Sequence, residues 1–192
     1  MKKIGVVILV VAGLFFAFKA IETSEWSLDK PHAKLSFTVS HMMVSDVEGW
    51  FKNFDAKISS TKADFSDAVV TMTAEVGSIN TDNDMRDKDL KSAGYFDAVK
   101  FPNLTFKSVS FKKVDDQNYK VIGDITIHGI TKTLELNALC KTGTNSMNKK
   151  SIAGFKITGT INRLDFGIGT ATPSAMIGDD VALIANVAFE KK

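Results

Sequence analysis

The sequence predicts an all-β domain of antiparallel strands with one short helical insert. Eight segments alternate apolar and polar residues with a period of two, which is the signature of half-buried strands. Short polar stretches at residues 115–118 and 128–131 separate neighbouring segments and are typical of hairpin turns. No long helical pattern lies between the segments, which argues against a parallel α/β sheet. Periodicity alone leaves open whether the strands close into a barrel or stack as a sandwich.

Each expected strand has one apolar face. The strands are expected at residues 35–41, 50–58, 68–76, 104–114, 119–127, 134–140, 153–161 and 181–189. In the first, Leu35, Phe37, Val39 and His41 share a face, and His41 is interpreted as a hydrogen-bonded structural residue. In the second, polar Lys52 interrupts the apolar face. Three glycines are expected where a barrel sheet would bend sharply, namely Gly123, Gly159 and Gly167.

A short helix is predicted between the third and fourth strands. The strand pattern ends near Thr81, Asp82 can cap a helix, and acidic residues fill the first turn. Leu90 and Lys91 follow at roughly helical spacing, and an aromatic loop then leads back to a strand near Leu104. An insert of this kind in an all-β chain is expected to cover one end of a cavity.

Residues 1–20 have the pattern of a secretory signal. Lys2 and Lys3 precede an apolar run over residues 4–18, whose length of about 15 residues is shorter than the roughly 20 that a bilayer span needs. Phe18 stands where signal cleavage prefers a small residue, so an uncleaved inner-membrane anchor stays an alternative to cleavage after Ala20. The expected location is therefore periplasmic or secreted, with residues 21–192 as the folded domain.

Charge and cysteine content exclude some classes of function. Residues 1–20 contain three of the 24 basic residues and no acid, so the remaining 21 face 22 acidic residues in the folded domain. A domain near neutrality lacks the basic surface that nucleic-acid binding requires. Cys140 is the only cysteine, which rules out an intrachain disulfide, and its place on an apolar strand face predicts a small buried side chain.

No catalytic or metal-binding motif is recognisable. The sequence lacks nucleophile elbows, zinc-protease helices, phosphate-binding loops and dinucleotide fingerprints, and its three histidines are widely separated. An enzyme that uses Asp87 or Asp165 with a neighbouring arginine ranks last among the hypotheses, because no nucleophile or oriented base can be named. Asp165 is instead expected to pair with Arg163 at a strand end.

Several short motifs occur in a fixed order along the chain. They are Trp26-x-Leu28-Asp29, Phe37-x-Val39-x-His41, Ser78-Ile79-x-Thr81, Arg86-Asp87-x-x-Leu90-Lys91-Ser92, Tyr95-Phe96-Asp97, Phe101-Pro102-x-x-Thr105-Phe106-Lys107-Ser108, Gly129-Ile130-Thr131-Lys132, Asn162-Arg163-x-Asp165-Phe166-Gly167 and Ile177-Gly178-Asp179. With these motifs the chain resembles the YceI-like family over nearly all of residues 25–190. That family comprises exported, lipocalin-like proteins associated with polyisoprenoid binding. Ala33 and Trp50 depart from its pattern and can reshape one end of a pocket.

The resemblance implies an eight-stranded antiparallel lipocalin-like barrel whose apolar cavity holds an isoprenoid chain. Composition alone, with 14 Phe against two Tyr and two Trp, instead favours a filled core, although it does not decide between the two. Ten residues are then expected to line the cavity: Phe37, Val39, Phe54, Met72, Ile79, Phe96, Phe106, Ile127, Phe155 and Phe166. Arg86 and Lys91 are expected at the mouth, where they can meet an anionic head group.

Two main functions follow from the sequence. The first is non-enzymatic binding and carriage of an isoprenoid lipid, of the quinone or prenyl phosphate type, in the cell envelope, with no cofactor or metal. The second is an envelope stress or interaction module whose barrel is filled by its own side chains. A cavity free of side chains favours the first. Transient membrane contact and a homodimer are both compatible with the sequence.

Overall fold

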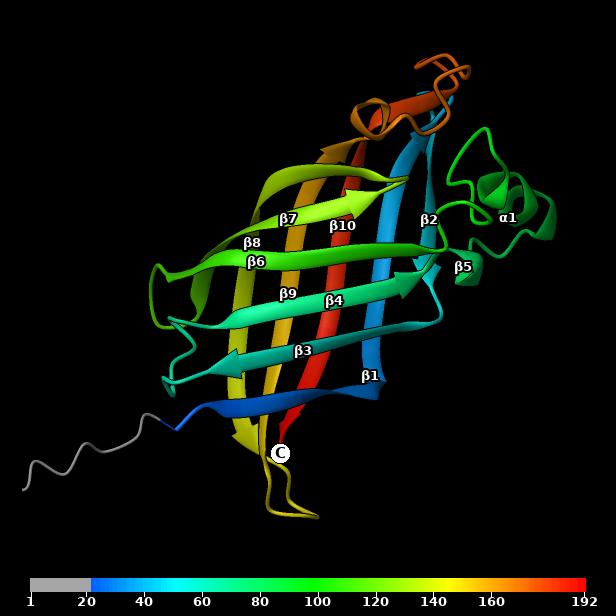
Figure 1. The fold of residues 1–192 in the computed structure, drawn as a ribbon. Helices are drawn as coiled ribbons and strands as arrows, with labels where there is room; N and C mark the ends of the chain where they lie inside the picture. Colours follow the sequence, from blue (N-terminus) through cyan, green and yellow to red (C-terminus); the bar gives the residue numbers. More distant parts are fainter. Residues whose placement is uncertain (1–21) are drawn as a thin grey trace, which may run out of the picture.

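Ten strands form one antiparallel sheet, and eight of them close into a barrel (Figure 1). The computed structural model describes residues 22–192, so the predicted signal segment at residues 1–20 lies outside the described residues. The barrel strands are β1 (Ser24–His41), β3 (Phe54–Ser60), β4 (Val69–Glu75), β6 (Asn103–Lys113), β7 (Asn118–Ile127), β8 (Ile130–Thr144), β9 (Ser151–Asn162) and β10 (Ile177–Lys191). Each pairs with the next, and β10 pairs with β1, so the fold is a barrel and not a sandwich. The ring is therefore complete within residues 22–192.

Strand β1 can close the barrel because its two halves have different neighbours. Residues 24–27 pair with β3, whereas residues 35–41 pair with β2 (Ser45–Phe51). Along its other edge β1 pairs with β10, with a shift of register between Leu28 and Ala33. Pro31 lies in this stretch, and a proline has no N–H to donate to the ladder. The interruption is where β1 changes direction (Figure 1).

The strand predicted at residues 50–58 is in fact two strands. Strand β2 ends at Phe51 and β3 begins at Phe54, with a turn at Lys52 and Asn53. The backbone N–H of Lys52 donates to the carbonyl of Ser78 at 3.1 Å, and that of Asn53 donates to Ser78 Oγ at 3.0 Å. Polar Lys52, which interrupts the expected apolar face, marks this turn.

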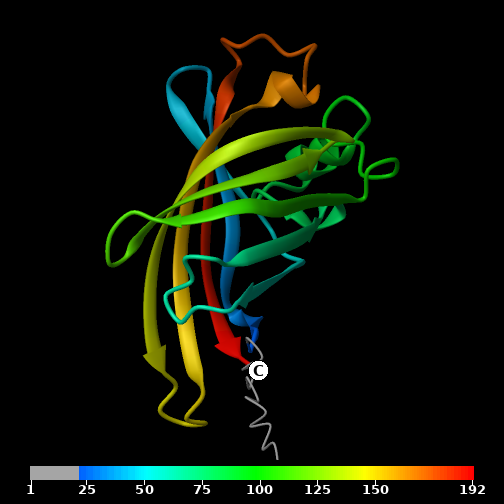
Figure 2. The same cartoon turned by 60° about the vertical axis from the view of Figure 1, so that its left-hand side comes forward.

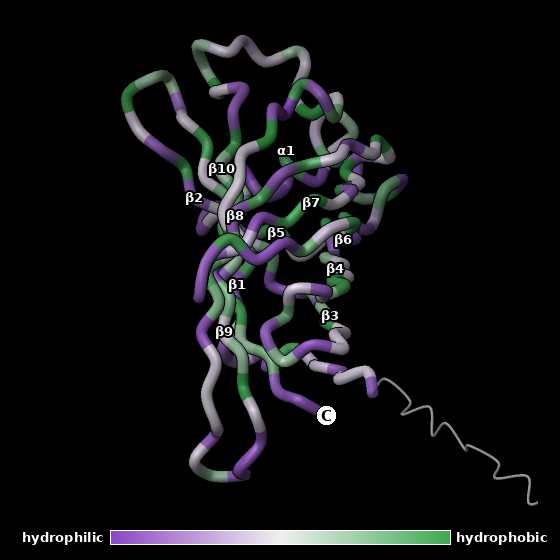
Figure 3. Tube along the Cα trace, turned by 90° about the vertical axis from the view of Figure 1, so that its left-hand side faces the viewer, coloured by the Kyte–Doolittle hydropathy of each residue, from purple (hydrophilic) through white to green (hydrophobic). Residues whose placement is uncertain are grey.

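The other predicted strands and both hairpin turns are confirmed, although β1 begins earlier, at Ser24. His128 and Gly129 link β7 to β8 with φ of 52° and 75°, the left-handed pair that a tight hairpin turn uses. Apolar and polar residues alternate along the strands, as Figure 3 shows. The apolar sets face the barrel interior.

The predicted helix is α1 (Asp84–Lys91), which lies outside the ring beside the two-residue strand β5 (Ile79–Asn80), itself paired with β2. Its N-cap is Asn83 and not the predicted Asp82, because Asn83 Oδ1 accepts from the N–H of Arg86 at 2.9 Å. Asp82 instead adopts a left-handed conformation one residue earlier. Within residues 22–192, no helix has the length and apolar character needed to cross a membrane.

The two ends of the barrel differ. Figure 2 shows the β1–β2 turn beside the segment that joins β9 to β10 at one end, whereas the β8–β9 turn extends from the other. At the end where β1 begins and β10 finishes, five aromatic rings fill the interior: Trp26, Phe65, Phe111, Phe155 and Phe189. Phe65 comes from the β3–β4 loop, and the hydroxyl of Tyr119 donates to the adjacent Asp64 carbonyl at 2.7 Å. This end of the barrel is closed.

Candidate functional site

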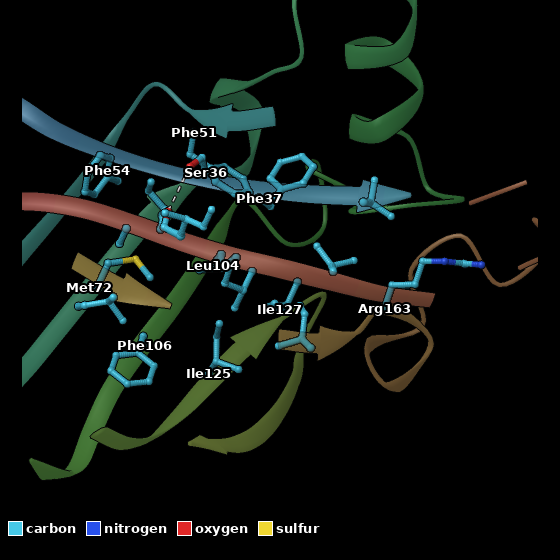
Figure 4. Close-up of a pocket in the computed structure, with 18 of the residues that line it drawn as sticks. Ser36, Phe37, Phe51, Phe54, Met72, Leu104, Phe106, Ile125, Ile127 and Arg163 are labelled. Carbon is cyan, nitrogen blue, oxygen red and sulfur yellow. Dashed lines mark hydrogen bonds between the residues drawn. The ribbon is translucent and has the colours of Figure 1, made fainter. Parts of the chain in front are cut away.

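The barrel contains a cavity of about 400 Å³, which lies within the usual range for small-molecule sites. Its wall includes residues from β1, β2, β3, β4, β6, β7, β8, β9 and β10, together with α1 and the loop that follows it. Figure 4 shows Phe54, Met72, Phe106, Ile125 and Leu104 around this space. Nearly all of the side chains deep in the cavity are apolar.

Two phenylalanines of the cavity wall each pack closely against a glycine of a neighbouring strand. A Cβ atom on Gly123 would lie 2.3 Å from Cζ of Phe106, and one on Gly49 would lie 2.4 Å from Cζ of Phe37. No side chain other than hydrogen allows such an approach. The rings therefore cover the wall and do not cross the interior. Of the other predicted glycines, Gly159 likewise accommodates Leu136, but Gly167 terminates a 3-10 helix, η2 (Arg163–Phe166), with a left-handed φ of 69°.

The aromatic end forms the floor of the cavity. Phe155 packs edge to face against Phe65, Phe111 and Phe189, with ring centroids 5.4, 6.1 and 6.0 Å apart. Phe111, Phe155 and Phe189 also line the cavity, so the same rings are core on one side and floor on the other. The phenylalanines thus fill part of the barrel and enclose the rest.

The opposite end of the cavity is polar. Its lining residues with hydrogen-bonding side chains include Ser40, His41, Thr81, Asn83, Arg86 and Asp89, together with Tyr95 and the buried Arg163. Arg86 donates from Nε to Thr81 Oγ1 and from Nη2 to the Thr81 carbonyl, both at 2.8 Å. Among residues 22–192, no group accepts from Arg86 Nη1. We call this end the mouth, because its polar groups come from the end of β1 and from the insert that flanks the barrel.

The cavity wall contains nine of the twelve residues that the sequence analysis assigned to the site. They are Phe37, Val39, Phe54, Met72, Phe96, Phe106, Ile127 and Phe155 in the wall and Arg86 at the mouth. Ile79, Phe166 and Lys91 lie elsewhere, which corrects their predicted position. Ile79 and Lys91 line a separate surface groove between β5 and α1, because β5 pairs with β2 outside the ring. Phe166 is buried in η2, where its carbonyl lies 3.0 Å from His128 Nδ1.

Several wall residues were not predicted, including Leu35, Phe51, Leu104, Ile125, Ile161 and Leu183. Most of them share a strand face with predicted residues, so the same period-2 pattern could have found them. Leu183 lies on β10, from which no cavity residue was predicted, and Phe51 was not found because the turn at Lys52 was missed. His41 lines the mouth, but among residues 22–192 its ring has no hydrogen-bond partner, which corrects the expected structural role.

Arg163 is organised differently from the sequence prediction. Its partner is Asp179, with Nη2 2.8 Å from Oδ1, and not the exposed Asp165. Its guanidinium also donates to the carbonyls of Gly178, Ile168, Gly169, Thr172 and Ile177 at 2.6–3.1 Å. The side chain is 4% exposed. Arg163 therefore holds the segment between β9 and β10 in place at the mouth end of the barrel.

The arrangement of the carboxylates offers little for catalysis. Asp87, one acid of the enzyme hypothesis, accepts from the N–H and the hydroxyl of Thr81 at 2.8 and 2.6 Å and so fixes α1 to β5. Asp165 does not line the cavity. Within residues 22–192, no three His, Cys, Asp or Glu side chains gather closely enough to hold a metal ion. Burial raises the pKa of the Cys140 thiol to about 11, which keeps it protonated near neutral pH.

Comparison with known proteins gives a consistent picture. The sequence model of the YceI-like domain matches residues 26–189. A UPF0312 protein of Staphylococcus aureus (strain bovine RF122 / ET3-1) is 37% identical over 174 residues, which cover 86% of this chain and 97% of that protein.

Solved structures share the fold. BcnA of Burkholderia cenocepacia superposes with a TM-score of 0.75 at 24% identity, covering 84% of this chain and 98% of BcnA. A mutant YceI protein of Campylobacter jejuni gives 0.74 at 30% identity, covering 80% and 90% of the two chains. A protein described as a polyisoprenoid binding domain, from Saccharophagus degradans, gives 0.63 at 16% identity, covering 87% and 98%.

Proposed function

Because this chain belongs to the YceI-like family, we propose that it binds the isoprenoid chain of a membrane lipid in its barrel cavity and carries it without chemical change. The observation that carries the proposal is the cavity itself, which is apolar along its walls, closed at one end and polar at the other. A polar ligand would leave its hydrogen-bonding groups without partners against such walls. The polyisoprenoid binding described for the Saccharophagus degradans domain is in keeping with this choice of ligand.

The size of the cavity is sufficient for useful affinity. A volume of about 400 Å³ has room for about a dozen carbon-sized groups at roughly 30 Å³ each. Each buried methylene contributes about 0.8 kcal/mol, so the gross gain is about 10 kcal/mol before the cost of ordering the chain. Micromolar affinity requires about 8 kcal/mol. The walls alone can therefore hold a tail, and a longer tail would extend through the mouth.

The mouth supplies a place for a polar head group. Arg86 keeps one guanidinium nitrogen free of partners among residues 22–192, and Asn83 and His41 line the same end of the cavity. A guanidinium favours a phosphate through charge-assisted bonds, and it can also donate to a quinone oxygen. We therefore keep both head groups in the proposal. The lysine expected beside it, Lys91, lies in the separate groove and takes no part.

The alternative function, an interaction module with a filled barrel, requires the interior to be packed throughout. The aromatic floor meets that description, but the space above it does not. The cavity therefore supports the carrier over the module. We place its work in the cell envelope, because Lys2 and Lys3 followed by the apolar run over residues 4–18 have the pattern of an export signal.

The direct test is to identify what the purified protein contains. Protein isolated from a membrane-containing host should show, in native mass spectrometry, a species heavier than the chain by the mass of one lipid. Organic extraction should then release a molecule with an isoprenoid tail. Protein that is free of lipid, and that also fails to bind geranylgeraniol added from ethanol, would rule out the proposal.

A further inference from the structure

The turn between β1 and β2 exposes apolar side chains beside the cavity mouth. Met42, Met43 and Val44 form this turn and are 52%, 78% and 88% exposed. The N–H of Met42 donates to the carbonyl of Met176 at 2.9 Å, which joins the turn to a further exposed methionine. Met85 of α1 lines the cavity and is also exposed. We call these five residues the apolar rim.

The backbone of the turn is strained for the residues it contains. Met42 and Met43 have φ of 53° and 56°, and the N–H of Val44 donates to the carbonyl of His41 at 3.2 Å. A β-turn whose two central residues are both left-handed strongly favours Asn-Gly at those positions, and each other residue costs on the order of 1 kcal/mol there. The exposed methionine side chains gain no packing that would offset this cost. Because no packing within the folded chain offsets this strain, we expect the turn to serve in contact with another molecule.

We infer that the apolar rim inserts into the surface of a lipid bilayer, so that the cavity mouth opens directly onto the membrane. The inference rests on the proposed function, because an isoprenoid tail that leaves a bilayer through such a mouth need not cross water. Methionine is long, flexible and apolar, which suits insertion among lipid chains that have no fixed shape. The rim is continuous with the cavity, since Met85 belongs to both.

Shape and charge favour a bilayer over a protein partner. A stable protein interface buries roughly 800 Å² on each side around a well-packed centre, whereas the rim residues surround an opening and offer no such centre. Residues 41–48 contain Asp46 and Glu48 but no Lys or Arg, and α1, which carries Met85, has three acidic residues against three basic ones, so the rim has no net positive charge that would attract anionic lipids. Apolar insertion remains as the driving force. Binding should therefore occur on zwitterionic vesicles and persist at about 1 M NaCl, where charge interactions are screened.

The fold provides a matched control at its other end. Met147 is 92% exposed in the β8–β9 turn, which extends from the opposite end of the barrel (Figure 2). Replacing it with Asn removes the same kind of side chain from the same kind of turn, far from the mouth. The rim variant is Met42→Asn/Met43→Gly, which gives the turn the residues that its geometry prefers. This variant should fold at least as well as the wild type.

The experiment measures flotation of residues 22–192 with phosphatidylcholine vesicles, together with binding of geranylgeraniol added from ethanol. We expect the double variant to raise the melting temperature, keep geranylgeraniol binding and lower the vesicle-bound fraction about tenfold. Met147→Asn should leave the vesicle-bound fraction unchanged. Vesicle binding that is absent in the wild type, or equal in the rim variant, would overturn the inference.

The two proposals fail in different ways. If the protein binds geranylgeraniol but not vesicles, the proposed carrier function stands and the proposed membrane contact of the rim is wrong. If the protein binds vesicles but not geranylgeraniol, the proposed carrier function is wrong, although the rim still binds the membrane. Sedimentation at several protein concentrations covers the remaining case, because a dimer that the rim variant abolishes would make the rim a protein interface and overturn the membrane inference.

Discussion

At the scale of single residues, the close packing of Phe106 against Gly123 shapes the cavity wall most clearly. A methyl group at Gly123 would meet the Phe106 ring at 2.3 Å, and both the ring and the nearby Lys107 carbonyl would have to move. Phe106 lines the cavity, so a displaced ring can enter that space. We expect Gly123→Ala to destabilise the fold by about 1–3 kcal/mol and to reduce the amount of bound lipid. Urea unfolding and quantitative lipid extraction measure the two effects.

Gly154 is the matched control for this substitution. It lies in β9, and a Cβ there would meet only the Lys141 carbonyl, at 3.9 Å. Gly154→Ala should therefore leave both stability and lipid content close to those of the wild type. Equal lipid loss in the two variants would show that the close packing of Phe106 against Gly123 does not keep the cavity open.

Asp67 makes stability depend on acid pH. Its carboxylate accepts from the hydroxyls of Ser60 and Thr61 and from the N–H groups of Thr61 and Lys62, and these bonds hold its pKa far below the usual 3.8. Below about pH 4 the unfolded chain therefore binds a proton that the folded chain does not. The stabilisation is complete above that pH and is lost as the pH falls toward the folded pKa.

Melting temperatures of the wild type and of Asp67→Asn, measured from about pH 6 to about pH 2, test this dependence. The wild type should be the more stable near pH 6, and the difference should shrink as the pH falls. Asp116→Asn is the control, since Asp116 is exposed and makes no side-chain hydrogen bond within residues 22–192. A difference that stays constant with pH would contradict the role assigned to Asp67.

At the scale of elements, the segment between β9 and β10 depends on Arg163 and Asp179. The Asp179 carboxylate accepts from Arg163 and from the hydroxyl of Ser174, at 2.8 and 2.6 Å. Asp179→Asn should cost about 1–3 kcal/mol, because it removes the charge that faces a buried guanidinium. Asp165→Asn should change stability by less than about 0.5 kcal/mol, since Asp165 is exposed. Urea unfolding compares the two, and an equal loss would refute the assigned pairing.

The element predictions succeeded where a local pattern decided the structure. Strand periodicity and turn residues were enough for β6, β7 and the His128–Gly129 turn between β7 and β8. They failed at Lys52, because one polar residue can be either an interruption or a turn until the bond to Ser78 is known. They failed again at Arg163, whose partner Asp179 is set by how the β9–β10 segment folds back.

At the scale of the whole molecule, composition could not separate a filled barrel from a hollow one. Phenylalanines that form the floor, such as Phe155, and those that line the open part, such as Phe37, have the same alternating neighbours in sequence. Only the resemblance to a known family favoured the cavity. The outward position of β5 was equally hidden, because a two-residue strand has no period, and this misplaced Ile79.

A larger side chain at one position of β10 can fill the cavity without disturbing the barrel. Ala185 and Ala182 lie three residues apart on β10, but Ala185 lines the cavity and Ala182 is exposed on the outer face. Ala185→Phe places a ring where the lipid tail would lie, so lipid recovered per protein should fall several-fold while the lipid-free barrel keeps its stability. Ala182→Phe adds the same ring outside and should keep the lipid. Native mass spectrometry of the two variants decides, because equal lipid content would place the bound tail outside the barrel.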